Sequence, residues 1–289
     1  MSAPAAGASA HPPSRAPVTA ARRAASAEVA RDSIRAHAVS APASGSAANA
    51  GVRAWRVVRL HFVNFSTIVI VPWIVLFAIA LLSVAVWAVV LSASPVIVTA
   101  APLALWSGAV FYLFVYMSVV AVQAMSATFP FALGIGSTRR DYAVGTALAF
   151  TLLSAGYGLA LTALSVAEEA SGGWWLGGRM FATPGLTDGP VLERLVVFFT
   201  GLMLFFFVGA VFAGAWLRWR VYGLVALGGA LASLFVALLF GVTATGSWAS
   251  LIDALVRLGA FGASLWSLVP TALAAVAAFL LLRRVTPRG

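Results

Sequence analysis

Lysine and cysteine are both absent from the 289 residues. Without lysine, the chain cannot contain a phosphate-binding loop of the form GxxxxGK[ST], so it does not bind and hydrolyse ATP in that manner by itself. Without cysteine, it has no disulfide, no thiol nucleophile and no cysteine metal site. Histidine occurs only at His11, His37 and His61, all before the first long apolar run.

Acidic residues are also scarce, with eight Asp and Glu in the whole chain. The centres of the apolar runs contain no Asp, Glu, Arg or His, although ion-driven carriers usually place such groups at mid-membrane. An intramembrane protease or metalloenzyme would need a nucleophile with its base, or paired ligands, inside these runs. Gly134-x-Gly136 lacks the third glycine of a dinucleotide fingerprint and follows a predicted helix. We therefore expect no enzyme activity and no cofactor or metal bound by this chain.

What the chain does contain is apolar: 62% of its residues are hydrophobic and only 9% are charged. A soluble protein of this size could not hide so much apolar surface. Several runs reach the ~20 residues that cross a bilayer as a helix. The sequence predicts an all-α integral membrane protein with six transmembrane helices in residues 51–289. The predicted spans are approximately 66–91, 96–126, 141–167, 194–216, 221–242 and 263–282.

Residues 1–50 are rich in alanine, serine and proline and are predicted to form a disordered cytoplasmic tail. The next fifteen residues, GVRAWRVVRLHFVNF, are typical of an amphipathic helix at the membrane surface. Arginines spaced by three would face phosphates, and aromatic side chains would face the acyl boundary. The alternative is a cytoplasmic extension of the first span. The residues of interest here are Arg53, Trp55, Arg56 and Arg59.

The net charge of +10 is distributed unevenly between the predicted loops. Fifteen of the eighteen arginines fall on the side of the two termini, and only Arg179, Arg194 and Arg257 fall on the other. The positive-inside rule then makes both termini cytoplasmic. The positive charge therefore indicates membrane topology, and we expect no nucleic-acid partner. On the outer side, Asp253 and Arg257 are four residues apart in a predicted small interfacial helix.

One polar stretch, residues 128–142, separates the second and third predicted spans. Thr138-x-x-Asp141 before an apolar run has the pattern of a capping box, with Thr138 as the N-cap of the third span. Arg139 and Arg140 then lie in the first helical turn, where the helix dipole disfavours cations. Either lipid phosphates or a cytoplasmic partner could favour them there. Phe129-Pro130-Phe131 followed by Gly134 and Gly136 could form a protruding helical knob that fills a partner's groove.

The segment FPFALGIGSTRRDYAVGTAL, residues 129–148, resembles the first cytoplasmic loop of ABC-2 type permease subunits of bacterial ABC transporters. RVVRLHFVNF resembles the connecting helix before the first span of these proteins. The resemblance covers roughly residues 51–289. It implies a permease in the cell membrane that pairs with a second copy or a paralogue, surrounded by membrane lipids. Separate ATP-binding subunits, which would hold ATP and Mg²⁺, would drive transport, with export expected.

The resemblance also implies that the first cytoplasmic loop couples the permease to its ATP-binding subunit. The residues that would form this coupling element are Phe129, Pro130, Phe131, Gly134, Gly136, Thr138, Arg139, Arg140, Asp141 and Tyr142. A non-transporting membrane scaffold or sensor subunit associated with an ATPase is the alternative. A membrane-embedded enzyme would require a cluster of buried acids facing one cavity.

Overall fold

The computed structural model describes residues 43–93 and 105–285, with side chains from Gly51 onward. The chain separates into two units, Met1–Gly51 and Val52–Gly289, and the contacts described below lie within the second. The described residues form helices and no strand, with a single parallel bridge between Trp106 and Arg179. The elements are α2 (Ala43–His61), η1 (Ser66–Ile70), α3 (Val71–Ala93), α5 (Ala109–Gly134), α6 (Arg139–Ala170), η3 (Gly173–Gly177), α7 (Val191–Ala244), α8 (Trp248–Trp266) and α9 (Leu268–Arg283).

Five helical segments among the described residues are long and apolar enough to cross a membrane. They are Ser66–Ala93, Ala109–Gly134, Arg139–Ala170, Val191–Ala244 and Trp248–Arg283. The predicted all-helical architecture is confirmed, and these five segments are compatible with a multi-pass membrane protein. The number differs from the six predicted spans because two of those spans, 194–216 and 221–242, lie in the single element α7.

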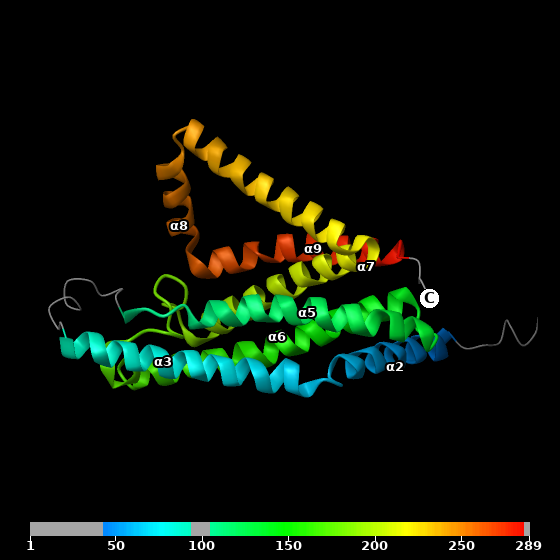
Figure 1. Ribbon diagram of the computed structural model, residues 1–289, viewed down its shortest axis with the longest axis horizontal. Helices are drawn as coiled ribbons and strands as arrows, with labels where there is room; N and C mark the ends of the chain where they lie inside the picture. The colour runs from blue at the N-terminus through cyan, green and yellow to red at the C-terminus, as the bar shows by residue number, and fades with distance from the viewer. Residues whose placement is uncertain (1–42, 94–104, 286–289) are drawn as a thin grey trace, which may run out of the picture. The chain divides into compact units, whose positions relative to one another are not determined.

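Helix α7 is 54 residues long and is interrupted at Arg220, whose φ of 57° and ψ of −138° are not helical. The chain reverses direction there, so that the element consists of a first arm, 191–219, and a second arm, 221–244 (Figure 1). The arms approach closely at Gly223, where an added Cβ would lie 2.6 Å from the Ala215 carbonyl oxygen. A glycine is therefore required beside the reversal.

The core of the second unit lies where α5, α6 and the first arm of α7 run alongside one another (Figure 1). Phe150 of α6 stacks on Phe206 of α7, with ring centroids 4.8 Å apart. Gly209 lets α7 approach α5, because a Cβ there would collide with the Ser118 carbonyl oxygen and the Ala121 side chain. Small residues at such contacts are the usual means by which membrane helices approach closely.

The first span begins with a π-helical turn, η1, just before Pro72. Proline has no N–H, so carbonyl groups one turn earlier lose their amide partner. Two tyrosines satisfy them: Tyr157 of α6 donates to the Ile68 carbonyl oxygen at 2.5 Å, and Tyr116 of α5 donates to that of Thr67 at 3.0 Å. The irregular backbone is thus held by two neighbouring helices, as expected inside a membrane.

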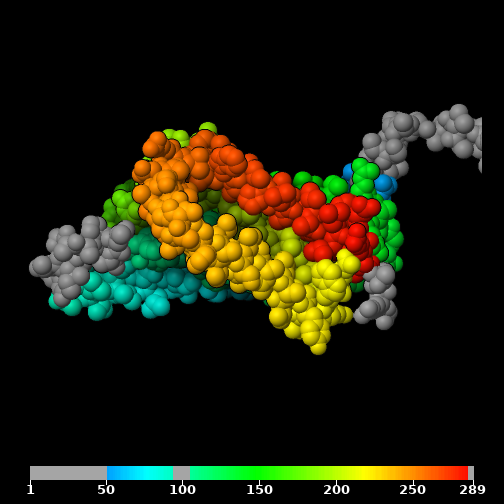
Figure 2. All heavy atoms as spheres, turned by 90° about the horizontal axis from the view of Figure 1, so that it is seen from above, coloured from blue at the N-terminus to red at the C-terminus, as the bar shows by residue number. Residues whose placement is uncertain are grey.

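The second arm of α7 and helix α8 leave large apolar side chains uncovered along most of their length. Tyr222 is 85% exposed, and Phe240 and Val256 are each 74% exposed. Figure 2 shows these segments, in yellow and orange, forming a ridge across one face. Exposing so many apolar side chains to water would cost free energy, whereas contact with acyl chains or with another membrane protein would be favourable.

Several boundaries of the described helices differ from the predicted ones. Helix α2 begins at Ala43, eight residues before the predicted start at Gly51, and residues 1–42 of the predicted tail lie outside the described residues. The predicted second span, 96–126, begins among residues that are not described, and α5 continues to Gly134 with Pro130 inside it. The predicted break at 128–142 therefore contracts to the four residues 135–138. Pro130 is exposed and lies inside α5, where its missing N–H leaves the Ser126 carbonyl oxygen without its helical partner.

Candidate functional site

The turn between α5 and α6 is short and sharply defined. Gly136 has a φ of +84°, a conformation that other residues adopt only with strain. Thr138 is the N-cap of α6, and its hydroxyl oxygen accepts a hydrogen bond from the Asp141 backbone N–H at 3.1 Å. The predicted cap is confirmed, and it fixes where α6 begins.

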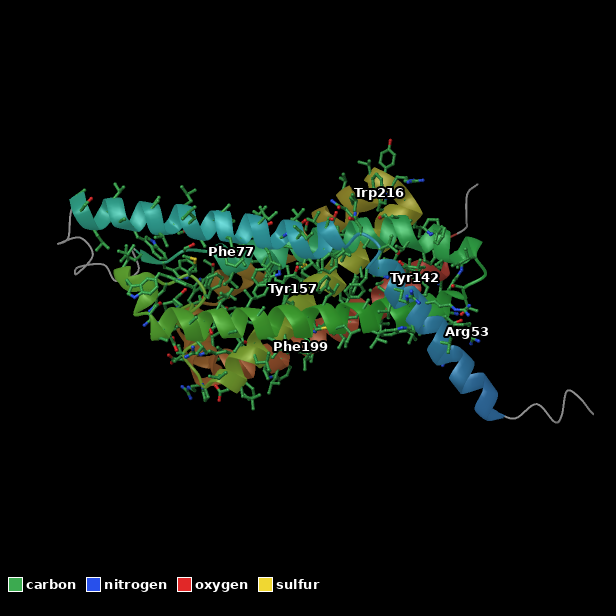
Figure 3. The ribbon with its side chains drawn as sticks, turned by 90° about the horizontal axis from the view of Figure 1, so that it is seen from below. Arg53, Phe77, Tyr142, Tyr157, Phe199 and Trp216 are labelled. Atoms are coloured by element: carbon green, nitrogen blue, oxygen red, sulfur yellow. The ribbon has the colours of Figure 1, made fainter. Side chains whose placement is uncertain are left out.

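Helix α2 contacts this turn through an ion pair. The Arg53 Nε donates to Asp141 Oδ2 at 2.8 Å, and the Asp141 side chain is only 10% exposed. Along α2, Ala54, Val57, Val58 and His61 are buried while the arginines point outward. Figure 3 shows Arg53 and Tyr142 close together where α2 meets α6. The face of α2 that carries Ala54, Val57 and Val58 is thus covered by protein, whereas Trp55, one of the aromatic residues predicted to face acyl chains, stays exposed.

The packing of α2 on α6 depends on a glycine. A Cβ added at Gly145 would lie 2.6 Å from both the Ala54 carbonyl oxygen and the Val57 Cβ. Since real Cβ atoms do not approach so closely, any larger residue would push α2 away. After α2, a turn at residues 62–64 precedes the first span. This break favours a separate connecting helix over an extension of that span.

His61 lies inside the protein and not on its surface. It is 2% exposed, between the rings of Tyr142 and Phe150, and its Nδ1 donates to the Val57 carbonyl oxygen at 3.1 Å. Burial lowers the pKa of the His61 imidazole, and the hydrogen bond to Val57 opposes this in part. The neutral ring is therefore favoured in the folded protein.

Arg139 connects the turn to the last described helix. Its guanidinium donates to the carbonyl oxygens of Leu282, at 3.0 Å, and Arg283. These carbonyls lie at the C-terminal end of α9, where the helix dipole favours a cation. The unfavourable position of Arg139 in the first turn of α6 is therefore offset by a favourable position against α9. Neither lipid phosphate nor a partner protein is needed to explain it.

Tyr142 and Phe129 join α5 to α6 beneath the turn. The Tyr142 hydroxyl lies 2.8 Å from the Thr128 hydroxyl oxygen, and the two aromatic rings meet edge to face with centroids 5.1 Å apart. Phe129 is only 1% exposed and Tyr142 is fully buried. The hypothesis that Phe129 fills a partner's groove is therefore not supported, because its side chain fills the core of this chain.

The outward surface of the junction is made by other members of the predicted set. Phe131 is 57% exposed, and Pro130, Gly134, Gly136, Thr138 and Arg140 are also exposed. Trp55, Arg56 and Arg59 are exposed on α2. The junction, defined here as residues 129–142 with Arg53 and the C-terminal end of α9, thus has an apolar and cationic outer surface. Its inner side is tied to α2, α5, α6 and α9.

A second polar cluster, centred on Glu168 in the last turn of α6, was missed from the sequence. Glu168 is 1% exposed, and its carboxylate accepts hydrogen bonds from the backbone N–H groups of Met180, Phe181 and Ala182 at 2.9–3.1 Å. The Trp174 indole N–H adds another at 2.9 Å. A carboxylate at a helix C-terminus opposes the dipole, and this was the signal that could have revealed it.

Glu168 is saturated by donors and is therefore suited to holding the loop between α6 and α7. Beside it, Glu169 Oε2 forms an ion pair with Arg194 Nη1 at 2.7 Å, without hydrogen-bond geometry. Arg194 also donates from Nε to the Gly189 carbonyl oxygen at 2.9 Å. In the part of the chain that the structure describes, no group of three or more His, Asp or Glu could hold a metal ion.

The predicted ion pair between Asp253 and Arg257 is present but weak. Arg257 Nη2 lies 3.9 Å from Asp253 Oδ2 in α8, and both side chains are mostly exposed.

Comparisons of the chain with protein families, curated proteins and solved structures find no match. A function for this chain therefore has to be inferred from the geometry of the junction and from the sequence resemblance.

Proposed function

We propose that this chain is an ABC-2 type permease subunit of an ABC transporter in the cell membrane. It would form the translocation path with a second copy or a paralogue, and a separate ATP-binding subunit would supply the energy. No ATP, Mg²⁺ or other cofactor is required in this chain. Export is the direction that the sequence resemblance favours.

The proposal rests on one observation. The turn between α5 and α6 has side-chain contacts with two further helices, α2 and α9. Arg53 ties Asp141 to α2 at 2.8 Å, and Arg139 ties the turn to the end of α9 at 3.0 Å. A force applied to this turn would therefore act on four helices together. A coupling element must have this property if it is to move the membrane-spanning part as a unit.

The outer surface of the junction supports contact with a partner. Phe131 and Arg140 flank the turn in sequence, and both are exposed. An exposed aromatic beside an exposed arginine has the composition of an interface centre. We assign the contact with the ATP-binding subunit to these two residues.

We further propose six membrane spans, with α7 counted as two because of the reversal at Arg220. The arginines at the junction, at the α7 reversal and at the end of α9 would lie in the cytoplasm, together with both termini. The Glu168 cluster would then lie on the outer side. This arrangement places the proposed contact surface where ATP is available.

The proposal is tested by purifying the tagged full chain from its native membranes. The Mg-ATP hydrolysis activity of the proteins that co-purify with it is then measured. The wild-type chain should retain an ATPase, and the double variant Phe131→Ala/Arg140→Ala should lose most of it. Matched controls are Phe111→Ala, an exposed phenylalanine at the far end of α5, and Arg257→Ala, an exposed arginine of α8. These should retain the ATPase.

The outcomes separate the alternatives. If no ATPase accompanies the wild-type chain, the permease assignment fails. If an ATPase is bound equally by wild type and double variant, the contact surface is elsewhere. Reconstituted complex that hydrolyses ATP but moves no lipid, peptide or polysaccharide across vesicles would favour the scaffold or sensor function.

A further inference from the structure

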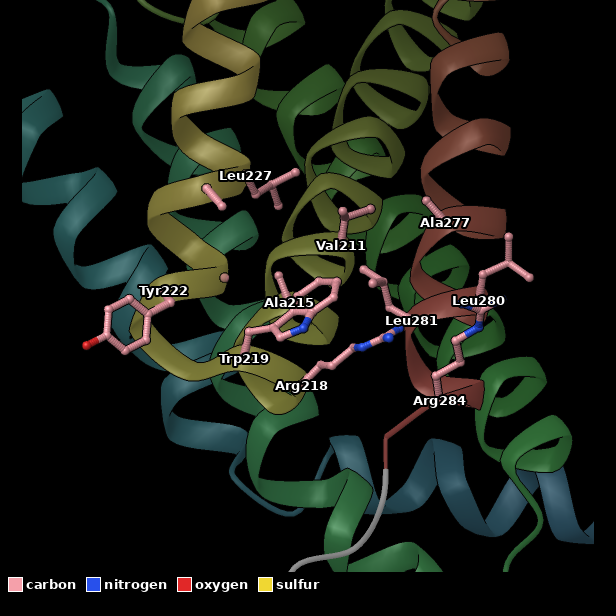
Figure 4. Close-up of a pocket in the computed structure, with 12 residues that line it drawn as sticks. Val211, Ala215, Arg218, Trp219, Tyr222, Leu227, Ala277, Leu280, Leu281 and Arg284 are labelled. Carbon is pink, nitrogen blue, oxygen red and sulfur yellow. The ribbon is translucent and has the colours of Figure 1, made fainter.

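A groove opens between the two arms of α7 and helix α9. It has a volume of about 780 Å³ and is lined mostly by apolar side chains, including Val211, Leu227 and Ala277. Figure 4 shows Arg218 and Arg284 at the same end of the groove, where α7 reverses and α9 ends. The groove is thus apolar along its length and cationic at one end. Its size is typical of a small-molecule site.

Among the residues that the structure describes, the two guanidinium groups lack a counter-charge. No carboxylate among the described residues forms an ion pair with Arg218 or Arg284. Asp141 lies two residues after Arg139, which contacts the end of α9, and its carboxylate is already paired with Arg53. Two uncompensated cations beside an apolar groove favour an anionic ligand, and arginine binds phosphate through two parallel hydrogen bonds.

The aromatic residues beside these arginines locate this end of the groove at the level of the headgroups. Trp219 and Tyr222 line the groove, and the Arg218 guanidinium lies 4.5 Å from the centroid of the Trp219 ring. Tryptophan, tyrosine and arginine together are typical of the membrane–water interface. The apolar walls then extend from the interface into the hydrocarbon region, in the direction that an acyl chain takes.

A second copy of this chain is a poorer occupant. In a parallel pair, the side chains facing this end would come from the same end of the partner, and Asp141 is the only described acid there. Glu168, Glu169, Asp188 and Glu193 lie towards the opposite ends of α6 and α7, and Asp253 lies in α8, after the far end of the second arm of α7. The described part of a copy would therefore offer the two arginines no unpaired carboxylate.

We propose that this groove binds an anionic phospholipid of the surrounding bilayer. The phosphate lies between Arg218 and Arg284, and an acyl chain lies along Val211, Leu227 and Ala277. Basic pockets between membrane helices have the chemistry that recognises anionic headgroups. The inference requires membrane embedding but is independent of the proposed transport function.

The test uses the purified full chain in detergent and native mass spectrometry. Phosphatidylglycerol and phosphatidylcholine with the same acyl chains are titrated in parallel. We expect phosphatidylglycerol to be retained more strongly. The double variant Arg218→Gln/Arg284→Gln should bind phosphatidylglycerol about thirtyfold more weakly, because each arginine contributes ~1 kcal/mol to the binding free energy. The matched control, Arg283→Gln, removes one charge from the same helix end but does not line the groove.

Two further measurements test the occupant itself. Ala277→Phe fills the groove without changing charge and should weaken phosphatidylglycerol binding, while inorganic phosphate at the same concentration should not displace the lipid. The proposal is overturned if phosphatidylcholine binds equally or if Arg283→Gln weakens binding as much as the double variant. It is also overturned if Ala277→Phe has no effect, if inorganic phosphate displaces the lipid, or if a second copy occupies the groove.

Discussion

The Arg139 guanidinium donates to the Leu282 carbonyl oxygen at 3.0 Å, so the first residue of α6 caps the C-terminal end of α9. This contact joins the junction to the helix that lines the proposed lipid groove. It also accounts for a cation at a helix N-terminus, because the dipole of α9 favours what the dipole of α6 disfavours.

Replacing Arg139 by glutamine should reduce the free energy of unfolding by about 1–2 kcal/mol, since a charge-assisted hydrogen bond to the end of α9 is lost. The measurement is thermal or denaturant unfolding in detergent. Arg140→Gln is the matched control, because Arg140 is exposed and should change stability by less than about 0.5 kcal/mol. Equal effects of the two changes would contradict the role assigned to Arg139.

Gly145→Ala should loosen α2 from α6, because the new Cβ would lie 2.6 Å from the Ala54 carbonyl oxygen. We expect faster proteolysis at the arginines of α2 and a stability loss of about 1–3 kcal/mol from overpacking. Gly156→Ala in the same helix is the control. Nothing lies within 4 Å of a Cβ at Gly156, so the higher helix propensity of alanine should leave stability unchanged or higher.

The ion pair between Arg53 and Asp141 should show a small coupling energy. Arg53 is 44% exposed, so solvent screening limits the coupling to about 1 kcal/mol or less. A double-mutant cycle with Arg53→Gln and Asp141→Asn measures it. Asp141→Asn alone should cost more than Arg53→Gln alone, because Asp141 also lies in the first turn of α6, where a negative charge is favoured.

Acidification should destabilise the packing of α2. The folded-state pKa of His61 is lowered from 6.5, so the unfolded state binds more protons at pH values between the folded and unfolded pKa. Stability is therefore highest above 6.5 and falls as the pH decreases towards the folded pKa. Unfolding measured from neutral to mildly acidic pH should show this fall in the wild type. The His61→Gln variant should lack the part of this pH dependence that His61 contributes. If the variant shows the same pH dependence as the wild type, the role assigned to His61 is contradicted.

Glu168→Gln should open the loop between α6 and α7. An amide would present N–H groups where the carboxylate now accepts from Met180, Phe181 and Ala182, at a cost of about 2–3 kcal/mol. Cleavage by chymotrypsin near the exposed Trp175 is the readout. Glu193→Gln, in the first turn of α7, is the control and should change stability by less than about 1 kcal/mol.

Features that depend on neighbouring residues could be predicted from the sequence. The Thr138 cap, the pair of Asp253 and Arg257, the apolar helices and the reversal near Arg220 all follow from local spacing or composition. Local rules fail where tertiary packing decides. The sequence suggested that Phe129 lies in a separate helical knob on the surface, whereas α5 continues through Phe129 and its side chain is buried against α6.

The contacts that define the junction were not predictable, because each joins two residues that are far apart in the sequence. Arg53 and Asp141 are separated by 88 positions, and Arg139 and Leu282 by 143 positions. Spacing within one helix does not indicate which other helix it meets. A physical signal was nevertheless present at both ends of α6. Arg139 at the start and Glu168 at the end each oppose the helix dipole, and each is compensated by a contact with a distant segment. Charges at the unfavourable end of a helix thus mark tertiary contacts.

The contact between Arg139 and Leu282 also constrains how the protein is made. Leu282 is synthesised 143 residues after Arg139, so the partner carbonyl groups do not yet exist when α6 leaves the ribosome. The contact between Arg139 and α9 can form only after α9 has been synthesised, so it belongs to a late stage of folding.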